Sequence, residues 1–388
     1  MRICLFTNTA FPCMGGQEMV VDELARQFMQ AGHEPVMLCP VPPTGYRASD
    51  SQYPYPVVRH PKYVSTKWLV EWYRLSLYWT VRKYRSDVVH CHNVYPNGYL
   101  AVLERLRGGP PVVITSHGGD VREDNPRYRN RGLRERHQFA VQHADALVSI
   151  GPFTDQGFRS LGARPEQLHS IPNGVHAGPY SQPVDRPAEL PVQLQSQQYL
   201  LFLGRLMPRK GVDVLLRALA LWRDRFSGST IPMLAVGGDG LERPALEKLT
   251  AELKLQQNVI FLGTVKDARK LWLLQNARLL MMPTREWEAF PMVLLEGFAA
   301  GCPVVASDAP GLKELITPGK TGWVVPRENP EALAEKLHQL WQQPALTRGI
   351  SSTVQAFAQQ CDWPVIACRH LELFESVVKS SQSLRLAS

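Results

Sequence analysis

Two short segments of this chain concentrate residues suited to binding a diphosphate and a sugar. The first runs from Gly204 to Gly211 and carries Arg205 and Lys210 in a turn between an expected strand and an expected helix. Gly204 lets the backbone turn closely, and the two cations would lie beside a helix N-terminus, where an anion finds charge, directional donors and the helix dipole together. Taken alone, the same residues also fit a solvated basic turn.

The second segment places two carboxylates, Glu288 and Glu296, eight residues apart. We expect Pro291 to be the first residue of a helix that ends near Gly301, because proline is tolerated at that position. Glu288 would then lie in the preceding loop and Glu296 inside the helix, so one carboxylate can face a sugar and the other can accept hydrogen bonds from ribose hydroxyls. The amides of residues 292–294 would be free to bind phosphate at the helix start. The alternative is an amphipathic helix with one solvated glutamate.

A sheet must position these segments, and the hydrophobic pattern predicts two series of strands and helices. The first series opens with a strand, the Gly15-Gly16 break, a helix over 17–30 and a strand over 35–39, which is a βαβ unit and predicts a parallel sheet. Its later strands are expected at 88–90, 112–116 and 146–150. The second series has strands at 199–203, 233–236, 259–261, 279–282 and 304–306, and helices at 212–223, 243–253, 268–274, 291–300 and 330–343.

The chain length of 388 residues suits two domains, and a proline- and glutamine-rich stretch at 181–198 is expected to link them. We therefore predict an α/β protein with two Rossmann-like, doubly wound domains, residues 1–190 and 198–362, facing each other across a cleft. Ligands of such domains bind at the carboxyl ends of the strands. A last helix within 363–388 is expected to pack back on the first domain.

Composition restricts the location and the class of partner. Seven cysteines are scattered without a CxxC pair, which indicates a reducing compartment and mostly buried thiols. The apolar start of the chain stops at Thr7, too early for a signal peptide, and no uncharged apolar run approaches the ~20 residues that span a bilayer. We expect a cytoplasmic protein. Its net charge of +8 has no recognisable nucleic-acid-binding module behind it.

The two segments belong to an ordered series of motifs that resembles the retaining family 4 glycosyltransferases of GT-B fold. The resemblance covers essentially the whole chain and is strongest from Gly204 to Trp323. Its pieces, in chain order, are Gly15-Gly16, Thr115–Gly118, Ile171–Val175, Gly204–Gly211, Gly237–Gly240, Phe261–Gly263, Glu288–Glu296 and Gly297–Val305.

The resemblance implies a role for each matching residue. The catalytic set that it implies is His117, Arg205, Lys210 and Glu288: the two cations hold the donor diphosphate, Glu288 lies beside the donor sugar, and His117 reaches that sugar from the first, acceptor-side domain. The donor-binding set, most of it in the second, nucleotide-sugar-binding domain, is Gly15, Gly16, Gly204, Gly238, Gly263, Met292, Val293 and Glu296. Glu296 would bind the ribose, and the backbone at Gly263 would read the base.

The implied reaction moves a hexose-type sugar from a nucleotide-diphosphate sugar to a glycan or lipid-linked acceptor, as in polysaccharide biosynthesis. It implies front-face attack, with the leaving phosphate taking the acceptor proton, and neither a cofactor nor a catalytic metal; the chain has no Asp-x-Asp motif. One departure concerns the usual glycines after the first glutamate, which are Ala289 and Pro291 here, so Met292 and Val293 would have to hold the phosphate. The alternatives are a non-catalytic nucleotide-sugar-binding protein of the same fold and another GT-B enzyme such as an epimerase.

Several residues keep two interpretations. His117 can act as a base, but an orienting hydrogen-bond donor is favoured. Asp120 can position the acceptor or cap the next turn, and Arg122 is a further acceptor-binding candidate. The run His90-Cys91-His92 lacks a fourth metal ligand, and a strand would put its histidines on one face and Cys91 on the other, so a structural role is favoured over a metal site.

A basic and aromatic segment at 59–86 is the main candidate for the acceptor side. Cations interleaved with tryptophan and tyrosine suit contact with an anionic membrane surface on its inner, cytoplasmic face. The alternative is a solvated helix face whose aromatic side chains belong to the core. The basic residues are Arg59, Lys62, Lys67, Arg74, Arg82, Lys83 and Arg85, and the aromatic ones Tyr63, Trp68, Trp72, Tyr73, Tyr78, Trp79 and Tyr84. Residues 122–136 add six arginines.

Overall fold

The computed structural model describes residues 1–10, 15–42, 50–61, 67–226 and 231–387, and gives the backbone alone for 67–71 and 384–387. The chain forms two compact units, residues 1–174 together with 363–388, and residues 175–362. The first unit thus ends before the expected linker at 181–198, and the last helix belongs to it. The chain passes from one unit to the other after Gly174 and again before Trp363. These two segments are adjacent, because the Val175 amide donates to the Cys361 carbonyl at 2.9 Å.

The described part of the first unit contains a parallel sheet in the order β3-β2-β1-β4-β5-β6-β7. Its strands are β1 (Arg2–Thr7), β2 (Glu34–Pro40), β3 (Val57–His60), β4 (Val88–His92), β5 (Val112–Ser116), β6 (Ala146–Ser149) and β7 (Leu168–Ser170). Its helices are α1 (Gly16–Gln30), α2 (Lys67–Lys83), α3 (Tyr99–Arg105), α4 (Arg131–His143), α5 (Pro152–Ser160) and α14 (Trp363–Ala387).

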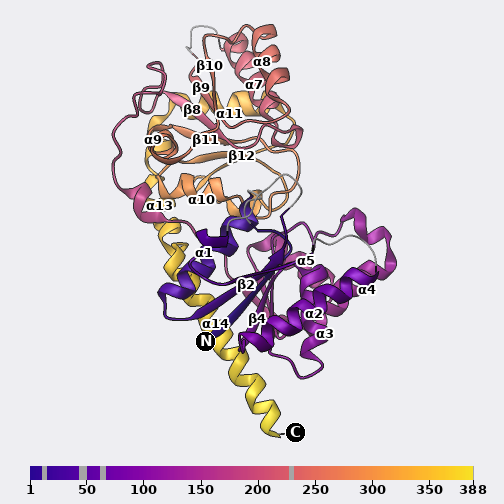
Figure 1. Ribbon diagram of the computed structural model, residues 1–388. Helices are drawn as coiled ribbons and strands as arrows, with labels where there is room; N and C mark the ends of the chain where they lie inside the picture. The colour runs from indigo at the N-terminus through magenta and orange to yellow at the C-terminus, as the bar shows by residue number, and fades with distance from the viewer. Residues whose placement is uncertain (11–14, 43–49, 62–66, 227–230, 388) are drawn as a thin grey trace. The chain divides into compact units, whose positions relative to one another are not determined.

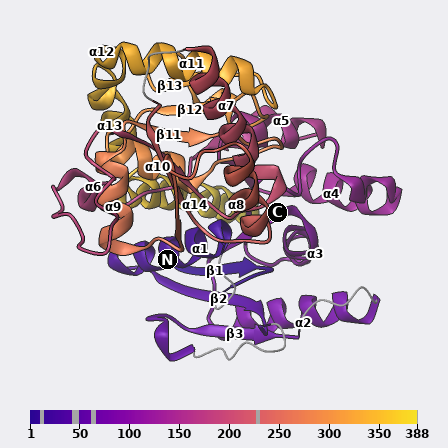
Figure 2. The ribbon, with the colours of Figure 1, turned by 90° about the horizontal axis from the view of Figure 1, so that it is seen from above.

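The helix α14 packs against α1 of the first unit (Figure 1). The Phe28 and Phe374 rings meet edge to face with centroids 5.6 Å apart, and both side chains are buried. The helix α2 runs beside the edge strand β3 (Figure 2). The buried Tyr73 and Leu77 on α2 join the core formed by the inward side chains of β1, β2, β4 and β5.

The second unit contains a second parallel sheet, in the order β10-β9-β8-β11-β12-β13. Its strands are β8 (Tyr199–Leu203), β9 (Met233–Gly237), β10 (Val259–Gly263), β11 (Leu279–Met282), β12 (Val304–Ser307) and β13 (Gly322–Val325). Its helices are α6 (Ala177–Ser181), α7 (Val212–Arg225), α8 (Arg243–Glu252), α9 (Asp267–Asn276), α10 (Met292–Ala299), α11 (Pro330–Gln342), α12 (Pro344–Arg348) and α13 (Ser351–Gln360). The core packs α7 and α11 against the sheet around the fully buried Trp222.

The expected elements are present, with boundaries that move by a few residues, so the predicted fold class of two parallel sheets with helices is confirmed. One boundary matters for chemistry. Pro291 is the N-cap of α10 and not its first helical residue, because its ψ of 126° is extended. The helix therefore begins at Met292.

The described cysteines and helices bear on two further expectations. Six cysteines are free thiols, of which five are buried and Cys368 is exposed; Cys13 lies outside the described residues. Burial raises the pKa of the Cys4 thiol to about 12. Within the described ranges, no helix combines the length and the apolar character that a membrane crossing requires.

Candidate functional site

The charged residues of the second unit gather where its strand order reverses. The chain moves from β8 to β9 and β10 on one side, and then returns to add β11 on the other side of β8. Ligands of doubly wound sheets bind at such a switch point, in the crevice beyond the carboxyl ends of the strands. The loop after β8 carries Arg205 and Lys210, and the loop after β11 carries Glu288.

The turn that carries Lys210 is fixed by the loop after β11. The Arg285 guanidinium donates to the Pro208 carbonyl at 2.8 Å and forms two hydrogen bonds with the Asp213 carboxylate. The Arg285 amide donates to the Arg209 carbonyl at 2.8 Å. Gly211 ends the turn at a φ of +66°, and a Cβ there would lie 2.0 Å from the Pro283 carbonyl oxygen. The sequence analysis missed Arg285, because its partners lie more than 70 residues earlier.

Lys210 and Glu288, which were predicted to bind different parts of a donor, contact each other. One carboxylate oxygen of Glu288 accepts from Lys210 Nζ and, at 2.8 Å, from Arg209 Nη1. The side chains of Lys210 and Glu288 are only 17% and 12% exposed. Burial lowers the pKa of Lys210, and Arg209 and Arg205 add to that effect while the Glu288 carboxylate opposes it. Arg209 is a further cation of this cluster that the sequence analysis did not single out.

Arg205 differs from Lys210 in its surroundings. Its side chain is exposed, and it forms no ion pair with any residue that the structure describes. Its charge nevertheless reaches Lys210, whose pKa it lowers. The turn therefore carries three cations, Arg205, Arg209 and Lys210, against the single carboxylate of Glu288, and this excess of positive charge suits an anionic ligand.

The start of α10 offers two free amides where three were expected. Within the described part of the chain, no acceptor faces the amides of Met292 and Val293. The Leu294 amide donates to the Pro291 carbonyl at 3.1 Å and is used up, so the expectation of a free amide at 294 is wrong. The cause is the position of Pro291, whose carbonyl as N-cap accepts the first helical hydrogen bond.

Glu296 lies inside α10, as expected, and is 8% exposed. Its carboxylate accepts from Lys270 Nζ of α9. Burial raises the pKa of the Tyr180 hydroxyl, and its hydrogen bond with Glu296 adds to that effect. Lys270 and Tyr180 were not predicted, since each joins the site only through packing of α9 and α6 against α10.

Two of the predicted glycines allow the strand ends to approach each other. Gly238 has a φ of +134°, and a Cβ there would lie 1.8 Å from the Gly204 carbonyl oxygen, so no other residue fits. The Gly238 amide donates to the Gly263 carbonyl at 2.7 Å. The structure therefore brings Gly204, Gly238 and Gly263 together at the carboxyl ends of β8, β9 and β10.

The first unit has its own switch point, between β1 and β4. Gly15 is the N-cap of α1 and Gly16 its first residue, in the connection that leaves β1. The side chain of Gln17 links the ends of β1 and β4. Its Nε2 donates to Thr7 Oγ1 at 3.2 Å and to the His92 carbonyl at 3.0 Å. Residues 11–14 of this connection lie outside the described residues.

His117 follows β5 and stacks on His92, which ends β4. Its Nε2 lies 3.2 Å from His92 Nδ1, within hydrogen-bond distance. Burial lowers the pKa of His117 to about 4, although Asp120 raises it slightly, so the ring is neutral at pH 7. His90 and His92 share one face of β4, with ring centroids 4.2 Å apart, and His90 Nε2 lies 2.7 Å from Thr115 Oγ1. Within the described residues, no three His, Cys, Asp or Glu side chains are arranged to hold a metal.

The two acceptor candidates are engaged with the protein itself. Asp120 accepts from the Val94 amide at 2.6 Å through one carboxylate oxygen and from Ser116 Oγ through the other. This geometry favours the capping interpretation, because Asp120 ties the loop after β4 to the loop after β5. Arg122 pairs with Asp124, the two closest atoms being 2.6 Å apart.

The aromatic side chains at 59–86 divide between the core and the surface. Tyr73 is buried, whereas Trp72 and Trp79 are 58% and 66% exposed on α2. Lys62, Tyr63 and the side chains of Lys67 and Trp68 lie outside the described residues. The segment is therefore neither a purely solvated face nor a set of core residues.

Comparison with known proteins places two family models on the chain. The model described as Glycosyltransferase Family 4 matches residues 14–178, and the one described as Glycosyl transferases group 1 matches residues 190–356. The phosphatidyl-myo-inositol mannosyltransferase of Mycobacterium tuberculosis is 28% identical over 411 aligned residues that cover 100% of both chains. The D-inositol 3-phosphate glycosyltransferase of Rhodococcus opacus is 30% identical over 74% of this chain and 67% of its own.

Solved structures share the fold over nearly the whole chain. Anabaena Alr3699/HepE, crystallised in complex with UDP, has a TM-score of 0.78 at 20% identity and covers 97% of this chain and 100% of its own. The sucrose-phosphate synthase of Thermosynechococcus elongatus has a TM-score of 0.77 at 22% identity, with 98% and 99% covered.

Proposed function

Because the chain belongs to glycosyltransferase family 4, we propose that it is a retaining enzyme that moves a hexose from a nucleotide-diphosphate sugar to a glycan or lipid-linked acceptor. The observation that carries this proposal is the cluster of Arg205, Arg209, Lys210 and Glu288 at the switch point of the second sheet. A structural neighbour was crystallised with UDP, which supports a nucleotide donor of this kind.

The donor diphosphate binds the turn after β8 and the start of α10. Lys210 Nζ has three donors, and Glu288 takes one of them, so the ammonium can contact a phosphate without leaving the carboxylate. Arg205 supplies an uncompensated charge, and the Met292 and Val293 amides supply donors at the positive end of the helix dipole. Glu296, oriented by Lys270 and Tyr180, accepts from the ribose hydroxyls.

The chemistry relies on stabilising the leaving group. As the glycosidic bond breaks, negative charge grows on the diphosphate, and preorganised cations and amides stabilise it without reorganising. The acceptor hydroxyl attacks from the same face, and the departing phosphate takes its proton. Arg205, Lys210 and the helix start supply the positive charge, so the proposal requires no metal. Neutral His117 orients the sugar by a hydrogen bond and does not act as a base, because its pKa is lowered to about 4.

The acceptor belongs to the class of glycans and lipid-linked molecules used in polysaccharide and glycolipid biosynthesis. Two relatives carry names that specify phosphatidyl-myo-inositol and D-inositol 3-phosphate, a lipid and a phosphorylated polyol. Trp72 and Trp79, exposed on the basic helix α2, support work at the cytoplasmic face of a membrane.

A thermal-shift screen tests the donor proposal. UDP, GDP and ADP are added singly to the full chain, with magnesium or with EDTA. We expect one nucleotide to raise the melting temperature by the same amount with magnesium and with EDTA. In Lys210→Ala, that nucleotide should no longer raise the melting temperature. Lys248→Ala is the matched control, since Lys248 is an exposed lysine on α8 that pairs with its neighbour Glu252. A shift that needs magnesium contradicts metal independence, and the absence of any shift contradicts the donor site.

A further inference from the structure

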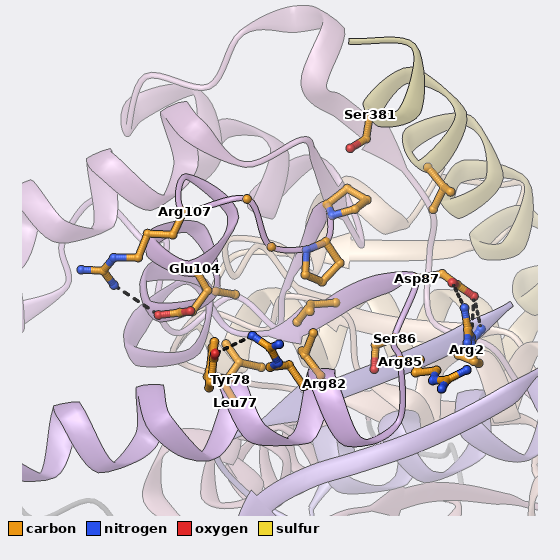
Figure 3. Close-up of a pocket in the computed structure, with 18 of the residues that line it drawn as sticks. Arg2, Leu77, Tyr78, Arg82, Arg85, Ser86, Asp87, Glu104, Arg107 and Ser381 are labelled. Carbon is orange, nitrogen blue, oxygen red and sulfur yellow. Dashed lines mark hydrogen bonds and ion pairs between the residues drawn. The ribbon is translucent and has the colours of Figure 1, made fainter. Parts of the chain in front are cut away.

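A cavity of about 730 Å³ opens at the amino-terminal edge of the first unit's sheet, at the opposite end of the strands from His117. Residues at the starts of β1, β4 and β5 line one side of it, and α2, the end of α3 and the last turns of α14 line the others (Figure 3). Neither the donor site nor the histidine cluster uses any residue of this cavity. Its volume lies within the ~300–1,000 Å³ typical of ligand pockets.

The cavity carries an excess of positive charge. Five arginines and two carboxylates line it: Arg2, Arg74, Arg82, Arg85, Arg107, Asp87 and Glu104. In Figure 3, the Glu104–Arg107 pair lies at one end and the Arg2–Asp87 pair at the other, with Arg82 between them. Glu104 is shared by two arginines, since Arg74 also contacts it at 2.6 Å.

Arg82 and Arg85 are the arginines that the cavity leaves for a ligand. Neither forms an ion pair with any carboxylate in the described part of the chain. Arg82 instead donates to the Tyr78 hydroxyl at 2.6 Å and lies over that ring. The pocket is thus lined by two guanidinium groups without a carboxylate partner among the described residues, and guanidinium groups are common ligands of phosphate.

The remaining wall of the cavity is apolar, which a small hydrophilic phosphate would not use. The apolar lining residues are Leu75, Leu77, Val81, Val89, Ala101, Pro110, Pro111 and Val378. A ligand that fills this cavity therefore combines an anionic group with hydrocarbon.

The outer face of α2 links the cavity to a membrane. Trp72 and Trp79 line a second hollow of about 300 Å³ on that face, and Leu75 lines both hollows. The two tryptophans are 58% and 66% exposed. Exposed tryptophan beside arginine and lysine is typical of helices that lie in the interface of a bilayer.

We propose that this arginine pocket binds the phosphate headgroup and upper acyl chain of an anionic membrane lipid, with Trp72 and Trp79 inserted in the same leaflet. The site is separate from the donor site, and binding to it does not require turnover. Its failure is therefore distinguishable from failure of the proposed transferase activity.

The first test is co-sedimentation of the full chain with phosphatidylcholine vesicles, with and without phosphatidylglycerol. We expect binding only with phosphatidylglycerol, and a weakening of about five-fold for each arginine removed. In the double variant Arg82→Gln/Arg85→Asn, the loss should reach about twenty-five-fold. Asparagine suits position 85, because the φ of Arg85 is +48°.

A charge-matched control separates the pocket from general attraction. Arg159→Gln/Arg164→Gln removes the same charge from the first unit at two arginines that pair with Asp155 and Glu166. We expect this control to bind vesicles almost as the wild type does. Equal losses in the two double variants would overturn the proposal.

A third variant fills the pocket without changing charge. Val378→Trp places a large ring in the cavity from α14, where Val378 is half-buried. We expect it to weaken binding to phosphatidylglycerol vesicles by about tenfold while the melting temperature stays within a few degrees, since a displaced lipid loses the apolar wall. Wild-type binding by Val378→Trp would overturn the pocket. If inorganic phosphate raised the melting temperature while the protein bound no vesicles, the ligand would not be a membrane lipid and the proposal would be overturned.

Discussion

The two units share a topology but present opposite chemistry at their switch points. In the second unit, a charged edge is formed by the loops after β8 and β11, where Lys210 and Arg209 contact the Glu288 carboxylate. In the first unit, a histidine edge is formed at the ends of β4 and β5 by His92 and His117. Burial lowers the pKa of both side chains. The fold thus provides a switch point in each unit, and the side chains at that point determine which kind of ligand suits it.

The difference has a physical consequence for each half of a transfer reaction. A diphosphate carries charge that must be balanced, so it requires cations that keep their charge at neutral pH. A sugar is neutral, and a buried neutral imidazole can donate one hydrogen bond and accept another without the desolvation cost of a charge. The charged edge thus suits the nucleotide, and the histidine edge suits the transferred sugar.

The largest effect is expected from a variant that removes a charge from the charged edge of the second unit. Lys210→Ala should lower kcat about 100- to 1,000-fold, because one donor to the developing negative charge is lost. Arg209 stays on Glu288 in this variant, so the melting temperature should change by only a few degrees. Turnover is measured as nucleotide diphosphate release, using the donor that the thermal screen identifies.

Glu288→Ala is the companion variant, and it should also lose most turnover while retaining nucleotide binding. Lys248→Ala again serves as the control and should keep wild-type kinetics. Near-normal kcat in Lys210→Ala would break the comparison, because the charged edge would then not be where the leaving group is stabilised.

The local pattern predicted most of the strands, but not β3, β7 and β13, each of which lies at the edge of a sheet. Spacing against a strand and a helix start is short-range information, so it could single out Arg205, Lys210, Glu288 and Glu296 as candidates. Their partners could not be singled out in this way, since Lys270 and Tyr180 meet Glu296 only through the packing of three helices. The position of Pro291 was also missed, because proline fits both the N-cap and the first helical residue.

Lowering the pH should destabilise the first unit more than the second. The pKa values of His60 and His117 are lowered to about 4 and that of His370 to about 3, chiefly by burial, and all three lie in the first unit. Between the unfolded pKa of ~6.5 and these values, the unfolded chain binds more protons, so stability falls as the pH falls. Each such histidine should cost about 2 kcal/mol at pH 5 relative to pH 7.5.

Differential scanning calorimetry at pH 7.5 and pH 5 measures this separation. The transition of the first unit should move to lower temperature, and the transition that a bound nucleotide raises should move less. His60→Phe should reduce the acid sensitivity, because it removes one of the buried titrating groups. Equal shifts of both transitions would show that the histidines do not distinguish the two units.

The smallest effect concerns the support behind the charged edge. Arg285→Lys keeps the charge, but a lysine cannot hold Asp213 bidentately while also donating to the Pro208 carbonyl. The turn that carries Lys210 should loosen, and we expect the KM for the donor to rise about tenfold, a cost of about 1.4 kcal/mol, with a smaller change in kcat. Arg223→Lys, an exchange on α7 at an arginine that pairs with Asp224, is the matched control. If the KM of Arg285→Lys equals that of the control, the turn is positioned by its other contacts, such as the hydrogen bond from Thr284 Oγ1 to the Arg209 carbonyl. If kcat falls more than KM rises, Arg285 acts on the transition state and the charged edge extends beyond the residues that touch the diphosphate.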